Sequence, residues 1–403
     1  MKKLFVDIEN LYSLAPAAKK DGRNIQEEDL GLIQDAAILT EGGKISWIGK
    51  KADAPAADKT ESLNVKTLLP AFIDCHTHMV FGGDRRDEFE LRNKGASYQE
   101  IAEAGGGIVS TVKATREASE DELLELAKER ESKYITQGVA TVEIKSGYGL
   151  TLQDELKILK VARKLEKLRV QTTFLGPHAI PKEFSNSKDY LDEVIQWLPE
   201  FKGIADRVDM FIEQGYFSLE DADRFFAEAE KLGFGICAHT DQLNPTGSSL
   251  YMAKKGALSV DHCVRMTDQE IINMAKTQTT AVLLPASDFY IRVPYPPARR
   301  LIEAGVPVAL ATDFNPGSAP SQDISFTGIL ARIEMKMTLP EVLLGLTFNA
   351  ARALGLQGQI GSLEVGKSAD FICMKGPLSE LFYEVGKRPI HALWKDAKSV
   401  FSN

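Results

Sequence analysis

The sequence contains no apolar run long enough to cross a membrane. A membrane-spanning helix needs roughly 18 or more apolar residues in succession, and no stretch of this 403-residue chain comes near that length. The chain begins with two lysines, but Asp7 and Glu9 fall where the apolar core of a secretion signal would lie. We therefore expect a protein that is not exported and has no membrane partner.

Cysteine is scarce as well. The four cysteines, at positions 75, 237, 263 and 373, follow neither zinc-finger nor disulfide-framework spacing. Their spacing favours a reducing, cytoplasmic environment in which each is buried as a small apolar side chain.

The chain also has fewer positively charged than negatively charged residues. The chain carries 48 Lys and Arg against 57 Asp and Glu, a formal net charge of -9. Binding to nucleic acid requires a basic patch, and the sequence shows none. We expect no nucleic-acid partner.

What the chain does contain is a series of short apolar runs that end in polar residues and are followed by helix-like segments. There are eight runs: LLPAFIDCHTH, VATVEIKS, VQTTFLGPH, DRVDMFIEQ, GFGICAHTD, ALSVDHC, TAVLLPAS and VPVALATDF. Two of the expected helices span 121–137 and 218–232, the second with Ser218 as N-cap and Asp221 three residues later. Eight strand-helix units over about 250 residues predict an α/β fold, a (β/α)8 TIM-type barrel, which we place at 68–360.

The two ends of the chain read differently from the middle. Residues 3–66 and the C-terminal segment hold short alternating runs typical of strands, and Gly42 with Gly43 indicates a hairpin turn. Neither end is long enough to form a stable sheet alone. We therefore expect one small, β-sandwich-like domain that combines residues 1–67 with 361–403.

Polar side chains end seven of the eight predicted barrel strands, where such barrels place their chemistry. They are His76, His78, Lys145, His178, Glu213, His239, His262 and Asp313. Five of the six histidines of the chain are in this set, so we expect them to meet at one mouth of the barrel.

His76 and His78 lie two residues apart, and side chains two apart on a strand share one face. Alone, this pair could be a chance feature of a surface strand. Together with His239, His262 and Asp313 at neighbouring strand ends, it predicts a catalytic metal site, because three or four such ligands around one open position hold a divalent metal.

This arrangement resembles the amidohydrolase superfamily of metal-dependent hydrolases. In that superfamily a lysine after the fourth strand often bridges a second metal, whereas the fourth run here ends in MFIEQG. The resemblance thus implies one zinc or iron ion per chain, held by His76, His78, His239 and Asp313. Glu213 is the residue that could support a second metal.

A narrower resemblance rests on seven segments that occur in order along residues 70 to 360. They are FGGDRRDEFELRNKGASYQEIAEAGGGIVSTVKATREAS, EIKSGYGL, TFLGPHAIP, HTDQL, SVDHC, AVLLPASDFY and ATDFNPGSAP. These segments resemble the imidazolonepropionase family of histidine degradation. The resemblance implies hydrolysis of the cyclic amide C–N bond of 4-imidazolone-5-propanoate, yielding N-formimidoyl-L-glutamate.

The resemblance also implies roles for single residues. Asp313 would transfer the water's proton to the departing nitrogen. His262 would donate a hydrogen bond to the carbonyl oxygen, although it could instead be a fourth histidine ligand or a histidine of the rim. Arg85 would bind the substrate's carboxylate, and Tyr148 and His178 would bind its ring, unless Tyr148 only packs beneath its loop.

Further binding residues implied by the resemblance are Asn315, Gly317 and Ser318, which would hold the carboxylate of the product. Gln242 occupies a position where one branch of the family has glutamate. An amide cannot act as a base, so Gln242 can only orient substrate or water. Gly105 to Gly107 lack the P-loop lysine and serine and indicate a turn.

Two other readings remain open. Another single-metal amidohydrolase, such as a deaminase or a cyclic amidase acting on a related nitrogen heterocycle, would share the barrel and the ligands. A non-catalytic member of the superfamily would be expected to lack ligands that are present here. Dimers are common among such barrels, so a homodimer is possible.

Overall fold

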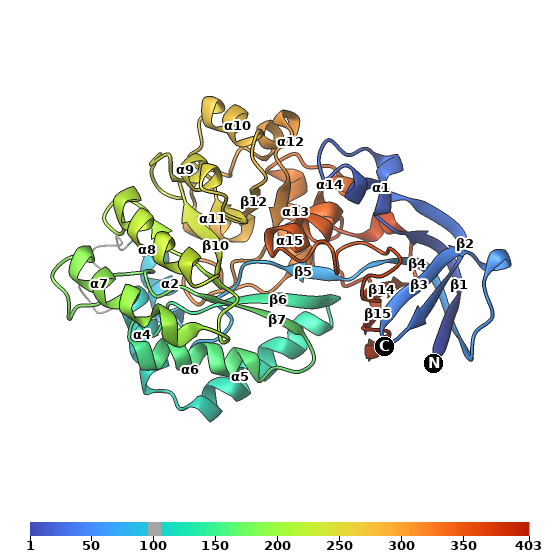
Figure 1. The fold of residues 1–403 in the computed structure, drawn as a ribbon, viewed down its shortest axis with the longest axis horizontal. Helices are drawn as coiled ribbons and strands as arrows, with labels where there is room; N and C mark the ends of the chain where they lie inside the picture. The colour runs from blue at the N-terminus through green and yellow to red at the C-terminus, as the bar shows by residue number, and fades with distance from the viewer. Residues whose placement is uncertain (96–105, 403) are drawn as a thin grey trace.

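The chain forms two β-sheets, one rolled into a barrel surrounded by helices and one built from both ends of the polypeptide (Figure 1). The structure is a computed structural model that describes residues 1–95 and 106–402. The two termini lie close together on the terminal sheet.

The barrel sheet consists of parallel strands in the order β13-β12-β11-β10-β8-β7-β6-β5, with β9 beside β10. Its strands are β5 (Phe72–Asp74), β6 (Val139–Lys145), β7 (Arg169–Phe174), β8 (Arg207–Val208), β9 (Phe211–Ile212), β10 (Gly235–Thr240), β11 (Ser259–His262), β12 (Thr280–Leu283) and β13 (Val308–Leu310). Each of the eight predicted runs supplies a strand, which confirms the predicted barrel. The fourth run differs in being split into β8 and β9.

The barrel closes beyond the ends of its first and last strands. The backbone N–H of Asp313 donates to the carbonyl oxygen of His76 at 3.1 Å, and that of His78 donates to the carbonyl oxygen of Phe314 at 2.9 Å. This seam joins the segment after β5 to the segment after β13. It brings the His-Thr-His sequence directly against Asp313.

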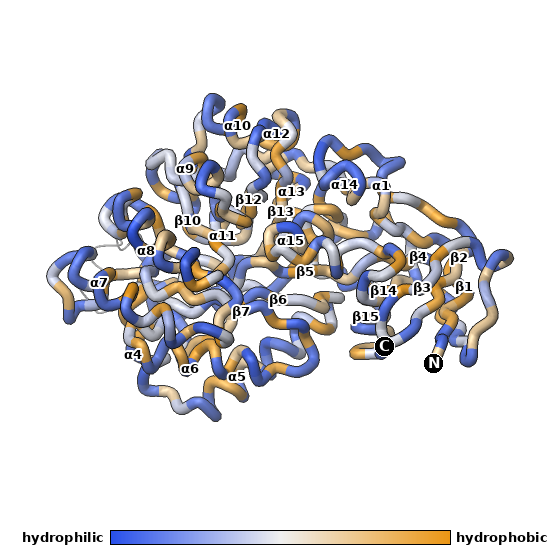
Figure 2. The backbone as a smooth tube through the Cα atoms, viewed as in Figure 1, coloured by the Kyte–Doolittle hydropathy of each residue, from blue (hydrophilic) through white to orange (hydrophobic). Residues whose placement is uncertain are grey.

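Helices surround the barrel strands. Their bounds are α1 (Ala15–Lys19), α2 (Arg86–Asn93), α4 (Ile108–Glu117), α5 (Glu120–Ile135), α6 (Leu152–Arg163), α7 (Ser187–Trp197), α8 (Leu219–Lys231), α9 (Ser248–Lys254), α10 (Asp268–Met274), α11 (Pro285–Ile291), α12 (Ala298–Ala304), α13 (Ile324–Ile333), α14 (Leu339–Gly345) and α15 (Phe348–Ala353). The prediction of a helix at 218–232 is confirmed, because the Ser218 side chain accepts from the backbone N–H of Asp221 while Asp221 caps Ser218 in return. Figure 2 shows hydrophobic stretches along the strands of both sheets and hydrophilic turns outside them.

The terminal sheet has seven strands in the order β16-β15-β14-β4-β1-β2-β3. Its strands are β1 (Lys2–Tyr12), β2 (Leu32–Glu41), β3 (Lys44–Lys50), β4 (Lys59–Pro70), β14 (Phe371–Met374), β15 (Ile390–Lys395) and β16 (Lys398–Ser402). β4 pairs with β1 on one side and with β14 on the other, so the predicted composite of both termini is confirmed. The predicted hairpin at Gly42 and Gly43 joins β2 to β3.

An apolar cluster lies on one face of this mixed sheet. The rings of Phe5, Phe371 and Trp394 meet there, with centroids 4.9 to 5.8 Å apart. The sheet curls back on itself, since the carbonyl oxygen of Gly43 accepts from the backbone N–H of Ala369 at 2.9 Å. The curl encloses the cluster, as the two layers of a sandwich would.

The two sheets are joined directly. Only Ala71 separates the end of β4 from the start of β5. Arg169 at the start of β7 forms ion pairs with Asp370 and Asp396, which flank strands of the terminal sheet. The domain division at 1–67 plus 361–403 and 68–360 stays a prediction, and β4 continues as far as Pro70.

The four cysteines are free and buried, as predicted. Within residues 1–95 and 106–402, every helix is too short or too polar to cross a membrane.

Candidate active site

Three of the predicted metal ligands come together at the carboxyl ends of the barrel strands. His76 and His78 follow β5, and His239 lies near the end of β10. One ring nitrogen from each lies within 4.8 Å of the others, and all three side chains are buried. Such a group of histidines suits a metal ion that prefers nitrogen ligands.

Asp313 completes this group from the other side of the barrel seam. Its Oδ1 lies 3.4 Å from Nε2 of His76 and 3.6 Å from Nε2 of His78. Ligands about 2.0–2.1 Å from a tetrahedral ion stand about 3.4 Å from one another. Nε2 of His76 is buried and has no hydrogen-bond partner among the described residues. The three histidines can hold a metal ion, and Asp313 stands at ligand spacing from two of them.

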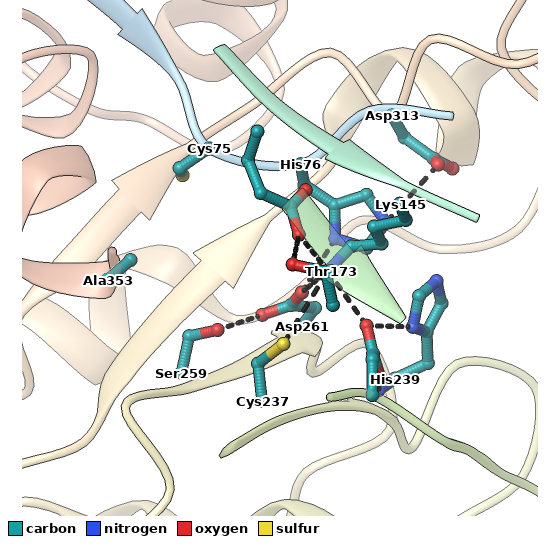
Figure 3. Close-up of polar contacts among 12 residues, drawn as sticks. Cys75, His76, Lys145, Thr173, Cys237, His239, Ser259, Asp261, Asp313 and Ala353 are labelled. Carbon is teal, nitrogen blue, oxygen red and sulfur yellow. Dashed lines mark hydrogen bonds and ion pairs between the residues drawn. The ribbon is translucent and has the colours of Figure 1, made fainter. Parts of the chain in front are cut away.

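Two aspartates that the sequence analysis did not single out touch the opposite nitrogens of these rings, and Figure 3 shows one of them, Asp261, beside His76. Oδ2 of Asp261 lies 2.6 Å from Nδ1 of His76, and Oδ2 of Asp209 lies 3.0 Å from Nδ1 of His239. A carboxylate at Nδ1 favours the tautomer with its hydrogen there, which leaves Nε2 as the free ligand atom.

Burial sets the protonation of the cluster. It lowers the pKa of His76, His78 and His262 well below the usual value, so these rings are neutral near pH 7. Burial works in the same direction on His239, but the carboxylate of Asp209 outweighs it and raises the pKa of that ring. Burial raises the pKa of Asp313 to about 7.

His262 is the last residue of β11 and is buried beside the cluster. Its ring centroid lies 5.3 Å from that of His239 and 5.8 Å from that of His76. Its φ is 73°, and φ at Asp313 is 54°, in the left-handed region that non-glycine residues seldom adopt. Strained backbone of this kind is often found at functional sites.

A cavity of about 660 Å³ opens onto the cluster, a size that suits a small ligand. All seven predicted substrate-binding residues line it: Arg85, Tyr148, His178, Gln242, Asn315, Gly317 and Ser318. His78, His239, His262 and Asp313 line it as well. A neighbouring cavity of about 980 Å³ shares Arg85 and Gly317 but includes none of the histidines of the cluster.

Tyr148 and His178 form an aromatic wall beside His78. The rings of His178 and His78 are stacked, with centroids 5.1 Å apart, and Tyr148 lies 5.5 Å from each. Nδ1 of His178 is 3.0 Å from the carbonyl oxygen of Gly147. Burial lowers the pKa of His178 to about 4, so its ring is neutral.

Glu155, which the sequence analysis missed, shapes the loop that carries Tyr148. Its buried carboxylate accepts hydrogen bonds from the backbone N–H groups of Gly147, Gly149 and Leu150 at 2.6 to 2.8 Å. The loop therefore takes its form from an acid at the start of α6, four residues after the N-cap Thr151.

Arg85 is already engaged by an acid within the protein. Its Nε and Nη2 donate to the two carboxylate oxygens of Glu88 at 2.7 and 2.6 Å. The face of the guanidinium that was predicted to bind a substrate carboxylate is thus occupied. Nη1 lies against Gly317, where an added Cβ would come within 2.0 Å of it.

The loop after Asp313 is held by Asn315. Its Oδ1 accepts from the backbone N–H of Gly317 at 2.9 Å and of Ser318 at 2.8 Å. A bound carboxylate could use these donors only after Asn315 releases them, and their role in product binding stays a prediction.

Glu213 has a structural task in the described part of the chain. It accepts from the backbone N–H of Leu243 and of Gln214, both at 2.9 Å, and from the side chain of Asn244 at 3.0 Å. These bonds fix the loop that carries Gln242. A second metal at Glu213 stays untested.

Of the predicted turn at Gly105 to Gly107, Gly105 lies outside the described residues. Gly107 has a φ of 76° at the start of α4, and its N–H donates to Glu88 at 2.8 Å.

Known protein sequences resemble this chain over nearly its full length. The model of the amidohydrolase family matches residues 67–400. The chain is 48% identical to the imidazolonepropionase of Bdellovibrio bacteriovorus, over 99% of this chain and 96% of that protein. It is 44% identical to the imidazolonepropionases of Rhizorhabdus wittichii, over 91% and 95%, and of Shewanella piezotolerans, over 92% and 91%.

Solved structures with lower identity share the fold. An adenosine deaminase from Xanthomonas campestris with bound zinc superimposes with a TM-score of 0.73 at 18% identity, over 98% of this chain and 92% of that one. A mutant atrazine chlorohydrolase from Arthrobacter aurescens, complexed with zinc and atraton, does so with a TM-score of 0.73 at 17% identity, over 100% and 95%. At these identities the likeness concerns the fold alone.

Proposed function

Because the chain belongs to the amidohydrolase family and, within it, to the imidazolonepropionases, we propose that it hydrolyses the ring of 4-imidazolone-5-propanoate to give N-formimidoyl-L-glutamate. The observation that carries this proposal is the full-length match at 44–48% identity. The buried histidine cluster supports it as well, because it borders a cavity large enough for a small ligand.

One zinc or iron ion would be held by His76, His78, His239 and Asp313. The unpaired Nε2 of His76 and its 3.4 Å separation from Asp313 support this set. When bound, the ion supplies the Lewis acidity that activates a water molecule for attack on the ring carbonyl.

Asp313 takes a proton from the attacking water and delivers it to the ring nitrogen as the C–N bond breaks. His262 donates a hydrogen bond to the carbonyl oxygen, where negative charge develops. Both residues line the cavity, and the neutral ring of His262 has an unpaired Nδ1 among the described residues. This position supports a donor role.

The substrate's propionate is received at the Arg85 side of the cavity. Since Glu88 occupies Nε and Nη2, the remaining Nη1 makes the contact. Tyr148 and His178 flank the ring, and Gln242 orients substrate or water through its amide. Asn315, Gly317 and Ser318 hold the carboxylate of the product.

We place this reaction in the cytoplasm, on the strength of four free, buried cysteines. The partner is a small-molecule substrate. A homodimer stays a prediction.

The test is the loss of substrate absorbance with purified protein, before and after chelation, with total metal measured on the same sample. We expect chelator-sensitive turnover and about one metal ion per chain. His239→Ala should lose both metal and turnover. His391→Ala is the matched control, because His391 lies on β15 of the terminal sheet and belongs neither to the histidine cluster nor to the lining of the cavity.

Metal without turnover of this substrate would contradict the proposed reaction while leaving the metal site in place. A panel of cyclic amides and aminated heterocycles would then identify the alternative hydrolase or deaminase.

A further inference from the structure

Lys145 ends the second barrel strand, yet the reaction outlined above gives it no task. Its side chain is 1% exposed. Its Nζ lies 2.8 Å from Oδ2 of Asp209, 2.9 Å from Oε1 of Glu143 and 3.5 Å from Oδ2 of Asp261. An ammonium group so deeply buried needs such partners, because removing it from water is costly.

Two of these carboxylates also face the metal cluster. The oxygen of Asp261 that faces Lys145 is Oδ2, and this same oxygen lies 2.6 Å from Nδ1 of His76. Likewise, Oδ2 of Asp209 contacts both Lys145 and Nδ1 of His239. One ammonium group therefore links two carboxylate oxygens, each of which touches a different histidine (Figure 3).

The other oxygen of each aspartate is held as well. Oδ1 of Asp261 accepts from the hydroxyl of Ser259 at 2.7 Å, and Oδ1 of Asp209 accepts from the backbone N–H of His239 at 3.1 Å. Both carboxylates are thus held in position through both of their oxygens.

The third acid ties Lys145 to the strand of the paired histidines. Oε2 of Glu143 accepts from the backbone N–H of Thr77, which lies between His76 and His78, at 3.3 Å. The Thr77 hydroxyl donates to the carbonyl oxygen of Glu143 at 2.7 Å. The contacts of Lys145 thus extend to the backbone around both histidines.

We infer that Lys145 is a positioning residue for the metal site. It holds Asp209 and Asp261 where they fix the rings of His239 and His76, with Nε2 of each directed at the metal. The inference rests on the proposed metal site but not on the identity of the substrate.

The experiment measures zinc affinity by competition with a chelator in wild type, Lys145→Met, Asp261→Asn and the double variant. Methionine keeps the length of the side chain and removes its charge. Partners that orient metal-binding histidines change metal affinity by about 10- to 100-fold, so we expect Lys145→Met to bind zinc that much more weakly. Because the two residues act as one unit, the double variant should lose less than the product of the two single losses.

The visible spectrum of the cobalt-loaded protein gives a second readout. We expect the Lys145→Met spectrum to shift, since the histidines no longer meet the metal in the same geometry. A purely structural role for Lys145 would lower the melting temperature while leaving the zinc affinity and the cobalt spectrum of the folded protein unchanged, which would overturn the inference.

Asp241→Asn is the matched control. Asp241 is a buried aspartate two residues after His239, but its carboxylate accepts from Thr246, Gly247 and Ser249. Its substitution should leave zinc affinity within about threefold, because these contacts lie outside the network of Lys145, its carboxylate partners and the histidines.

If Lys145→Met does not fold, the single variants Asp209→Asn and Asp261→Asn decide the matter. Weaker zinc binding in both supports the inference, and unchanged binding overturns it. Wild type that binds zinc without converting the substrate would contradict the proposed reaction alone. Wild type that binds no zinc would overturn the metal site and this inference together.

Discussion

His262 adopts a backbone conformation that costs a non-glycine residue free energy, and it does so beside the ring of His239. Its imidazole lines the cavity. Burial keeps the ring neutral near pH 7, so one of its nitrogens carries the hydrogen that can be donated and the other can accept a hydrogen bond.

His262→Asn should therefore lower kcat by about 10²- to 10³-fold, the usual effect of removing one donor to a developing oxyanion. Asparagine tolerates positive φ, so the fold should be kept, but its amide is too short to reach the same point. Steady-state kinetics and metal analysis of the same sample test this. Loss of the metal in the variant would instead make His262 a ligand.

Asp313 gives the metal site a pH dependence. Burial raises its pKa to about 7, so in metal-free protein the carboxyl is protonated below that pH and ionised above it. Metal binding requires the ionised form. Through this proton alone, zinc affinity should therefore rise by about tenfold per pH unit up to about pH 7. Above that pH, Asp313 is already ionised and adds no further pH dependence.

Competition titrations between about pH 5.5 and about pH 8.5 measure this slope, with the chelator's own protonation taken into account. In Asp313→Asn, the slope of log zinc affinity against pH should be smaller by one proton. The proton of His239 contributes equally to the slope of both proteins. Equal slopes would contradict the assignment.

The strand ends of the barrel share one rim, which predicted that the histidines and Asp313 meet, and the family resemblance supplied the other residues that line the cavity. The sequence did not reveal Asp209 or Asp261. Both aspartates act on histidines of other strands. Where Asp261 lies depends on the register of β10 against β11, which puts it opposite His239 in the sheet. The available signal was a charged residue inside an apolar run, as in DRVDMF and SVDHC.

At the scale of elements, the connection from β6 to α6 determines where Tyr148 lies. Its backbone N–H groups converge on Glu155, and Gly147 adopts a φ of 106° there. An added Cβ at Gly147 would come within 2.8 Å of Nδ1 of His178, so this loop and the adjacent ring fit closely.

Glu155→Gln should lower the free energy of unfolding by about 1–3 kcal/mol, since the new amide group leaves buried N–H donors without an acceptor. KM should rise because Tyr148 is no longer held. Denaturant unfolding and steady-state kinetics measure the two effects. Glu129→Gln, on the exposed side of α5, is the control and should change stability by under about 0.5 kcal/mol.

Apolar runs predicted all eight barrel strands, and the helix boundaries at 218–232 lie within one residue of the structure. They could not predict that the fourth run breaks at Asp209 and Met210, because strand pairing depends on neighbours far along the chain. The seam between His76 and Asp313 was equally invisible, as it forms from segments outside the regular strands.

At the scale of the whole molecule, ion pairs and a nearly continuous strand join the barrel to the terminal sheet. Arg169 links β7 to Asp370 and Asp396, and β4 continues almost directly into β5. The fold and the family could both be predicted from sequence, since segment order and composition extend over most of the chain. Assembly could not, because no segment specifies an interface.

Trp394→Ala should lower the free energy of unfolding by about 3–5 kcal/mol, because the indole fills the apolar cluster of the terminal sheet. Unfolding should remain a single transition, with the barrel and the sheet lost together. Differential scanning calorimetry tests both points. Tyr383→Ala, at a side chain that is 78% exposed, is the control. Two separate transitions would contradict the coupling.

The pairing of β4 with β14 has a consequence for synthesis. About 300 residues separate these neighbours, so at about 5–20 residues per second a ribosome needs ~15–60 s to deliver the second after the first. Throughout that interval the nascent chain presents an unpaired strand edge, which can pair with other chains. A message cut short within the barrel would leave that edge open permanently, and its product would depend on chaperones or be degraded.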